Sequence, residues 1–138
     1  DGTIKEILII DDDPNDLRLM DKVLTEQGRY KVTLAEGGRK GWEAIVTKAP
    51  DAIILDIFMP GMDGFETMRL VRERQPQIPI VVISGQPVTW DPEQTPDFLT
   101  MATKLGAVSS LQKPFRPADL LAAVARGLNA SGGVATSP

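Results

Sequence analysis

The chain has 138 residues, 42% of them hydrophobic and 25% charged, and 15 basic against 19 acidic side chains leave a net charge of −4. These values are typical of one globular domain that buries its own core. Cysteine and histidine are both missing, which excludes disulfides, thiolate metal sites, an imidazole base and a phosphohistidine carried by this chain. A pI near 4.8 without a basic cluster argues against direct nucleic-acid binding by this segment.

The ends of the chain define the expected domain. Residues 1–4 are expected to be an N-terminal extension or an expression remnant, residues 5–130 one domain, and residues 131–138 a flexible tail or the start of a linker. No apolar run approaches the roughly 18 residues of a membrane span, and no secretory signal opens the chain. We therefore expect a cytoplasmic protein without membrane insertion.

Five short apolar runs alternate with five segments of helical period. The runs cover residues 7–10, 30–34, 52–55, 80–83 and 107–111. This order predicts an α/β fold of (βα)5 type, with a parallel sheet covered by helices on both faces. The second run alone alternates, with Tyr30, Val32 and Leu34 apolar, which is typical of a half-exposed edge strand.

The helix signals are similarly regular. The first helix is expected to begin with Asp13 as N-cap and Pro14 at its first position and to end at Gly28, and the fourth to run from Thr95 to Gly106. The apolar stripes expected to face the sheet are Leu17, Met20 and Leu24; Trp42, Ile45, Val46 and Ala49; Phe65, Met68 and Val71; Phe98, Met101, Ala102 and Leu105; and Leu120, Leu121, Val124 and Leu128.

Polar residues end four of the five predicted strands. They are Asp11 and Asp12, Asp56, Ser84 and Lys113. Because ligands of open α/β sheets bind beyond the carboxyl ends of the strands, we expect these side chains to share one site. Three carboxylates and one ammonium leave a charge of −2, which a hard dication such as Mg²⁺ or Mn²⁺ can neutralise through oxygen ligands.

Such a site can carry out phosphoryl chemistry. A carboxylate beside a dication, a hydroxyl and an ammonium can attack phosphorus and become an aspartyl phosphate. Simpler readings exist: Asp11 and Asp12 as helix caps, Ser84 as a turn residue and Lys113 as a surface lysine. The metal pair could also be Asp12 and Asp13, but the apolar run stops at Ile10, which favours Asp11 and Asp12.

Four ordered motifs carry a family resemblance. They are Ile7 to Asp12, Leu55 to Gly64, Ile83-Ser84-Gly85 and Lys113-Pro114-Phe115. Over residues 5–128 the chain resembles the receiver domain of two-component response regulators. The resemblance implies a flavodoxin-like three-layer sandwich with a five-stranded parallel sheet in the order 2-1-3-4-5, a fold for which receivers are a standard example.

The resemblance also implies roles for single residues. Asp56 would be the phosphoacceptor; Asp11, Asp12, Asp56 and the backbone carbonyl of Phe58 would hold Mg²⁺; Ser84 and Lys113 would bind the phosphoryl group; and Pro114 would follow a cis peptide bond. Gly85 would leave room beside Ser84 for the phosphoryl group. The donor would be a phosphohistidine of a sensor histidine kinase or of a histidine phosphotransfer protein.

On this reading the chain is a signalling switch more than an enzyme. It would assist its own phosphorylation and dephosphorylation and change the surface that an output domain or partner protein binds. The family's output face, the fourth helix, fifth strand and fifth helix, would be the surface that changes. The output and the cognate kinase are left open by the sequence.

Three features depart from the family pattern. Ser110 occupies a position where receivers commonly carry an aromatic switch residue. Ser84 and Lys113 lie 29 positions apart, so residues 86–94 form a longer loop, and its Trp90 is a candidate to pack over the site or on a partner. Phe58, two residues after Asp56, is a candidate to slow dephosphorylation by limiting water access.

Three other functions match parts of the sequence pattern. A haloacid-dehalogenase-type phosphatase would use Asp11, Asp13, Ser84 and Lys113, but it needs an acidic pair after the lysine, where only Asp119 follows, and it leaves Asp56 without a role. A pseudo-receiver would bind partners without phosphorylation, which the intact set of five site residues speaks against. A flavodoxin would need a Ser/Thr/Gly-rich phosphate loop in place of Asp11 to Asp13.

Overall fold

The computed structural model describes residues 3–57, 64–85, 104 and 106–133, with only the backbone for 130–133. The strands are β1 (Glu6–Asp11), β2 (Lys31–Glu36), β3 (Ala52–Asp56), β4 (Ile80–Ser84) and β5 (Ala107–Gln112). The helices are α1 (Pro14–Lys22) with its π-helical continuation η1 (Val23–Gln27), α2 (Gly38–Thr47), α3 (Gly64–Arg74) and α5 (Pro117–Gly133).

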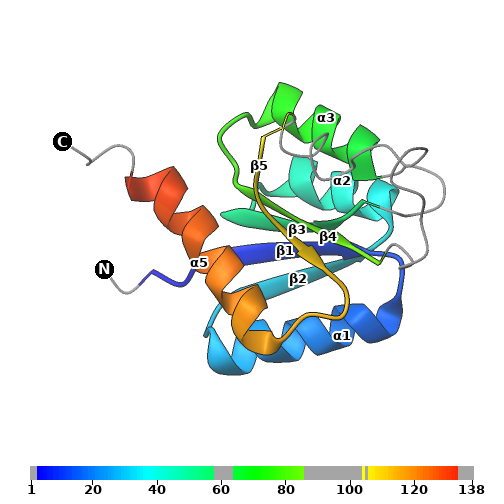
Figure 1. Ribbon diagram of the computed structural model, residues 1–138. Coiled ribbons are helices and arrows are strands. Elements are labelled where there is room, and N and C mark those ends of the chain that lie inside the picture. The colour runs from blue at the N-terminus through cyan, green and yellow to red at the C-terminus, as the bar shows by residue number, and fades with distance from the viewer. Residues whose placement is uncertain (1–2, 58–63, 86–103, 105, 134–138) are drawn as a thin grey trace.

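The five strands form one parallel sheet in the order β2-β1-β3-β4-β5, which confirms the expected flavodoxin-like topology (Figure 1). In the central register Ile9 of β1 lies between Leu34 of β2 and Ile54 of β3. Strand order reverses at β1 and β3, so the carboxyl ends of these two strands border the crevice where ligands of such sheets bind.

Alternating side chains of the central strands supply two separate cores. Leu8 and Ile10 of β1 pack with α2 and α3, whereas Ile7 and Ile9 pack with α1 and α5. Figure 1 shows the same division, with α1 and α5 on one face of the sheet and α2 and α3 on the other. Because β1, β3 and β4 are buried on both faces, they read as continuous apolar runs, and this burial holds their polar ends in place.

The first helix follows the expected capping. The Asp13 side chain accepts a hydrogen bond from the Asn15 N–H at 2.9 Å, Pro14 stands at the first helical position, and Gly28 ends η1. Leu17 and Met20 are buried as predicted. This cap fixes where α1 begins, three residues after Asp11.

The second helix differs from the expectation in its buried face. Gly41 and Ile45 face the sheet, while Val46 is 49% exposed and the helix ends before Ala49. A Cβ at Gly41 would lie 2.5 Å from Cδ1 of Ile10, so α2 packs close to β1 only because Gly41 has no side chain. The prediction that Val46 and Ala49 point inward was therefore wrong.

The edge strand and the last helix also differ in detail. In β2 the small Ala35 is buried and Leu34 is 40% exposed, since Ala35 lies in the core beneath α2. The helix α5 continues to Gly133, three residues past the expected domain boundary. Its Leu120 and Val124 are buried as predicted, and Leu121 and Leu128 are partly buried. The predicted fourth helix falls almost entirely outside the described residues.

None of the helices within the described ranges is both long enough and apolar enough to span a bilayer.

The start of α3 makes a testable close contact. A Cβ on the buried Gly64 would clash with the Cα of Ile57 and would lie 2.6 Å from the backbone oxygen of Asp56. Backbone atoms cannot move aside as a flexible side chain can, so we expect Gly64→Ala to lower the free energy of unfolding by about 1–3 kcal/mol. Urea unfolding measures this, with Val46→Ala on the exposed face of α2 as the control. Equal midpoints for Gly64→Ala and wild type would contradict this packing.

Candidate functional site

The polar residues predicted from the sequence meet at one edge of the sheet. Asp11, Asp56 and Ser84 are the last residues of β1, β3 and β4, and Lys113 directly follows β5. Each of β1, β3 and β4 continues one residue past the end of its apolar run, because the backbone of Asp11, Asp56 and Ser84 still takes part in the strand pairing. The site is built on rigid central strands, and this placement restricts how far its side chains can move.

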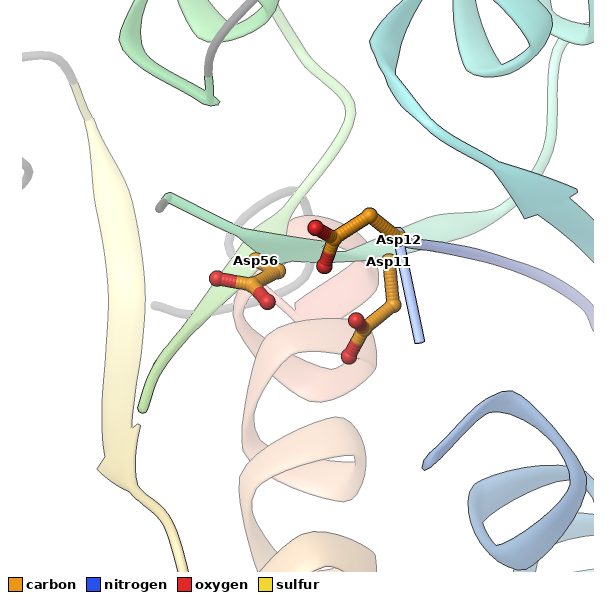
Figure 2. Close-up of side chains that lie close together, drawn as sticks. All are labelled: Asp11, Asp12 and Asp56. Carbon is orange, nitrogen blue, oxygen red and sulfur yellow. The ribbon is translucent and has the colours of Figure 1, made fainter. Parts of the chain in front are cut away.

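Asp11, Asp12 and Asp56 form an acidic cluster. One carboxylate oxygen from each lies within 4.8 Å of the others, and Figure 2 shows the three side chains turned toward a common space. Asp11 is fully buried and Asp56 is 3% exposed, while Asp12 reaches solvent. Two ionised carboxylates at about 5 Å repel each other by roughly 3 kcal/mol at an effective dielectric constant of 20, so the cluster requires positive charge.

Lys113 supplies one positive charge. Its ammonium donates hydrogen bonds to Asp16 at 2.7 Å, to Asp11 at 3.0 Å and to Asp56 at 3.2 Å. Burial acts to lower the pKa of Lys113, but the hydrogen bonds to Asp16 and Asp11 and the charges of Asp56 and Asp11 outweigh it and raise the pKa above the ordinary lysine value. Lys113 therefore stays protonated across the physiological range.

Asp16 is a part of the site that sequence reasoning missed. It lies in the first turn of α1, and its carboxylate makes the shortest of the three ion pairs of Lys113. An aspartate in a first helical turn is ordinarily explained by the positive end of the helix dipole. The signal that could have revealed Asp16 is its place in the sequence: α1 begins at Pro14, two residues after Asp12, so its first turn lies close to the end of β1.

The end of β4 lies against Lys113. The Lys113 backbone N–H donates to the Ser84 carbonyl oxygen at 2.8 Å, and Ser84 is 5% exposed. A Cβ at Gly85 would sit 3.4 Å from Cδ of Lys113, so the aliphatic stem of the lysine passes over this glycine. The Lys113–Pro114 peptide bond is cis, the isomer that the family resemblance implies.

The remaining positions singled out in the sequence are Ser110, Phe58 and the loop 86–94 with its Trp90. Ser110 is an exposed residue of β5 opposite Val82 of β4. Phe58, the loop 86–94 and Trp90 within it lie outside the described residues. The roles expected for them stay predictions.

The fold and the acidic cluster together define the family. The family model described as "Response regulator receiver domain" matches residues 7–125. The chain belongs to this family: it is a receiver domain of two-component response regulators, consistent with a phosphorylation-dependent signalling switch.

Relatives and solved structures agree with this assignment. The chain is 31% identical over 121 residues to the DNA-binding transcriptional regulator NtrC of Klebsiella pneumoniae, a match that covers 88% of this chain and 24% of NtrC. It is 34% identical over 116 residues to the response regulator MprA of Mycolicibacterium vanbaalenii, covering 84% of this chain and 47% of MprA. The chain thus spans a quarter to a half of these relatives.

A solved structure of similar size is the chemotaxis protein CheY4 of Vibrio cholerae. It is 28% identical, with a TM-score of 0.79, and the match covers 91% of this chain and all of that one.

The alternative functions are not favoured. A haloacid-dehalogenase-type phosphatase would need a second acidic site after Lys113, but Asp119 at the start of α5 is bound by the Arg116 guanidinium at 3.1 Å. It also leaves the buried Asp56 unused. A phosphorylation-independent pseudo-receiver is disfavoured because all five site residues expected from the sequence are in place at the strand ends.

Proposed function

We propose that Asp56 is the residue that accepts the phosphoryl group. The observation that carries this is the placement of its carboxylate: almost buried, at the end of a central strand, within 4.8 Å of two further carboxylates and 3.2 Å from the Lys113 ammonium. A carboxylate in this position is a nucleophile with a cation already beside it. Of the three cluster members, Asp56 alone comes from the β3 end, between the β1 pair and the β4 hydroxyl.

Asp11, Asp12 and Asp56 are proposed to hold Mg²⁺, with Mn²⁺ as a substitute. The donor set fits a hard divalent cation, because it consists of carboxylate oxygens that converge on one space and carries more negative charge than Lys113 offsets. The backbone carbonyl of Phe58 is proposed as a further ligand. When bound, the cation would neutralise negative charge on the transferring group and on the cluster.

The proposed transfer step uses the Asp56, Lys113 and Ser84 side chains. An Asp56 carboxylate oxygen attacks the phosphorus of a phosphohistidine, an O–P bond forms as the N–P bond breaks, and the imidazole nitrogen keeps the bonding electron pair and takes up a proton. Lys113 is proposed to turn one N–H toward a phosphoryl oxygen, and the Ser84 hydroxyl to donate to another. Because these 138 residues contain no histidine, the phosphohistidine lies outside this segment, and a small phosphodonor can take its place.

We propose that the partner is a sensor histidine kinase or a histidine phosphotransfer protein, and that the exchange takes place in the cytoplasm. The receiver family supports both proposals. Phosphorylation would then shift the population between two surface states that an output domain or partner reads. The β5–α5 side of the sheet, tied to Lys113 through the chain itself, is the part of the described structure best placed to respond.

Phosphorylation by a small donor tests this function. Incubation with acetyl phosphate and Mg²⁺ is expected to add one phosphoryl group per chain, measured by intact-protein mass spectrometry, and chelation of the metal is expected to abolish the addition. Continuous release of phosphate from simple phosphomonoesters would instead favour the phosphatase function. An unmodified mass in the presence of Mg²⁺ would contradict the proposed role of Asp56.

Removing one proposed ligand should weaken the metal site. Asp12→Asn keeps the side-chain shape and deletes one negative charge at an exposed position, so we expect the Mg²⁺ dissociation constant to rise by about ten-fold, a free-energy change of about 1.4 kcal/mol. The measurement is the increase in melting temperature as Mg²⁺ is titrated. Glu26→Gln, on the exposed face of η1, serves as the control. A titration curve of Asp12→Asn that overlays wild type would rule out Asp12 as a ligand.

A further inference from the structure

The ammonium of Lys113 has three N–H donors, and in this structure all three point to carboxylates. Two of these carboxylates, Asp11 and Asp56, belong to the acidic cluster proposed to hold the cation. The third, Asp16, belongs to α1 and lies outside the cluster found among the described residues. Binding of the cation and of the phosphoryl group therefore affects the three hydrogen bonds of Lys113 differently.

Asp11 and Asp56 must turn oxygens to the cation, and Asp56 must also carry the phosphoryl group. Their bonds to Lys113, 3.0 Å and 3.2 Å long, are the ones that loading would weaken. Asp16 is not a proposed ligand of the cation or of the phosphoryl group, and its hydrogen bond to Lys113 is the shortest of the three at 2.7 Å. It is also the carboxylate nearest to solvent, with a side chain that is 33% exposed against 0% and 4% for the other two.

We propose that Asp16 is a positioning residue that holds the Lys113 ammonium over the site while Asp11 and Asp56 are engaged elsewhere. The proposal rests on the proposed function, since it assumes that phosphoryl transfer occurs at Asp56. Asp16 itself touches neither the cation nor the phosphoryl group. It acts through Lys113, by keeping one N–H bond in place before and after loading.

The surroundings of Lys113 explain why an anchor is needed. The lysine side chain is a flexible chain of four methylene groups. It passes over Gly85, which has no side chain that could restrict its movement. Asp16, Gly85, Lys113 and Phe115 line an open cavity of about 500 Å³ beside the site. A lysine released by Asp11 and Asp56 could swing into this space. The bond to Asp16, at the wall of the cavity, prevents that movement.

Asp16 could instead slow phosphorylation in the wild-type protein, and its removal would then have the opposite result. Asp16 adds a negative charge near the phosphoryl group and could compete for the ammonium. If competition dominated, removing the charge would accelerate phosphorylation. If Asp16 positions Lys113, removing its charge slows phosphorylation, because a poorly held Lys113 ammonium is less well placed at the moment of transfer. The sign of the effect therefore separates the two.

The test compares Asp16→Asn, Asp16→Glu and the control Glu26→Gln, which removes the same charge some ten residues, or about 15 Å, further along the helix. Saturating Mg²⁺ and acetyl phosphate are used throughout. We expect phosphorylation of Asp16→Asn to slow by about ten-fold, near the lower end for losing a partner that orients a functional side chain. Asp16→Glu, which restores the charge, should recover most of the rate, and Glu26→Gln should match wild type.

A second readout does not depend on phosphorylation. In ¹⁵N-labelled protein without any phosphodonor, the Lys113 ammonium signal should persist in wild type when Mg²⁺ is added, because Asp16 still holds it. In Asp16→Asn the signal should be lost to fast solvent exchange on addition of Mg²⁺. Loss of the signal in wild type as well, or an unchanged or faster rate in Asp16→Asn, would overturn the proposal. If wild type is not phosphorylated at all, the proposed function fails, and the ammonium signal still decides the role of Asp16.

Discussion

Asp56→Asn is expected to abolish phosphoryl uptake, with incorporation at least about a hundred-fold below wild type under saturating acetyl phosphate and Mg²⁺. Asparagine has the shape of aspartate, but its amide is not a nucleophile toward phosphorus and its neutral oxygen is a weaker ligand for a dication. The substitution also removes one of three crowded negative charges. We therefore expect the metal-free variant to be no less stable than wild type in urea.

The control for this experiment is Asp21→Asn. Asp21 lies on α1, five residues or about 7.5 Å further along the helix than Asp16, and it accepts a hydrogen bond from the Thr25 hydroxyl at 2.8 Å. It should incorporate phosphate at the wild-type rate. Undiminished incorporation in Asp56→Asn would show that another residue accepts the phosphoryl group. Loss of incorporation in both variants would point to unfolding, which circular dichroism of the same samples measures.

Lys113→Met should produce the largest stability loss among the site variants. Methionine has a similar length but no charge, so the buried Asp11 and the nearly buried Asp56 lose the cation that offsets them. Leaving one member of a buried ion pair unpaired costs about 3–5 kcal/mol, and the partial exposure of Lys113 places our expectation at about 3 kcal/mol. Urea unfolding in the presence of a chelator measures the change.

Mg²⁺ should recover part of this loss. A dication bound by the acidic cluster supplies positive charge in place of the missing ammonium, and binding to the folded state adds stability by mass action. The melting temperature of Lys113→Met should therefore rise more on adding Mg²⁺ than that of wild type. If Lys113→Met were as stable as wild type in the absence of metal, the ammonium would not be needed to offset the repulsion between the carboxylates.

The same pair of proteins predicts a pH dependence. The pKa of Lys113 is raised in the folded state above the ordinary lysine value of 10.5. Its contribution to stability is then fully present below pH 10.5 and is lost as the pH rises from there toward the folded-state pKa. The difference in unfolding free energy between wild type and Lys113→Met should stay constant up to pH 10.5 and become smaller at higher pH. A difference that persists undiminished in stronger alkali would contradict the ion pairing described here.

Much of the fold followed from the sequence for physical reasons. Residues buried on both faces make β1, β3 and β4 continuous apolar runs, and the parallel order brings their polar ends to one edge. Hydrophobic periodicity did not predict which face of a helix is buried where close backbone packing determines it. In α2 it placed Val46 inside, but the close approach of Gly41 to Ile10 turns another face to the sheet.

The candidate site was predictable only where a residue ends a strand. Asp11, Asp56, Ser84 and Lys113 stand out because each interrupts or follows an apolar run. Asp16 does not, because an acidic residue in the first turn of a helix has an ordinary explanation in the helix dipole. Its bond to Lys113 joins positions 97 residues apart in the chain, and neither local propensity nor spacing reveals such a contact.

The most direct test of the account is to locate the phosphoryl group. Borohydride reduces an acyl phosphate of aspartate to homoserine, so protein phosphorylated with acetyl phosphate and Mg²⁺ can be reduced, digested and sequenced by mass spectrometry. We expect homoserine at position 56 and at no other aspartate. Homoserine at Asp11, Asp12 or Asp16, or its absence from a phosphorylated sample, would contradict it.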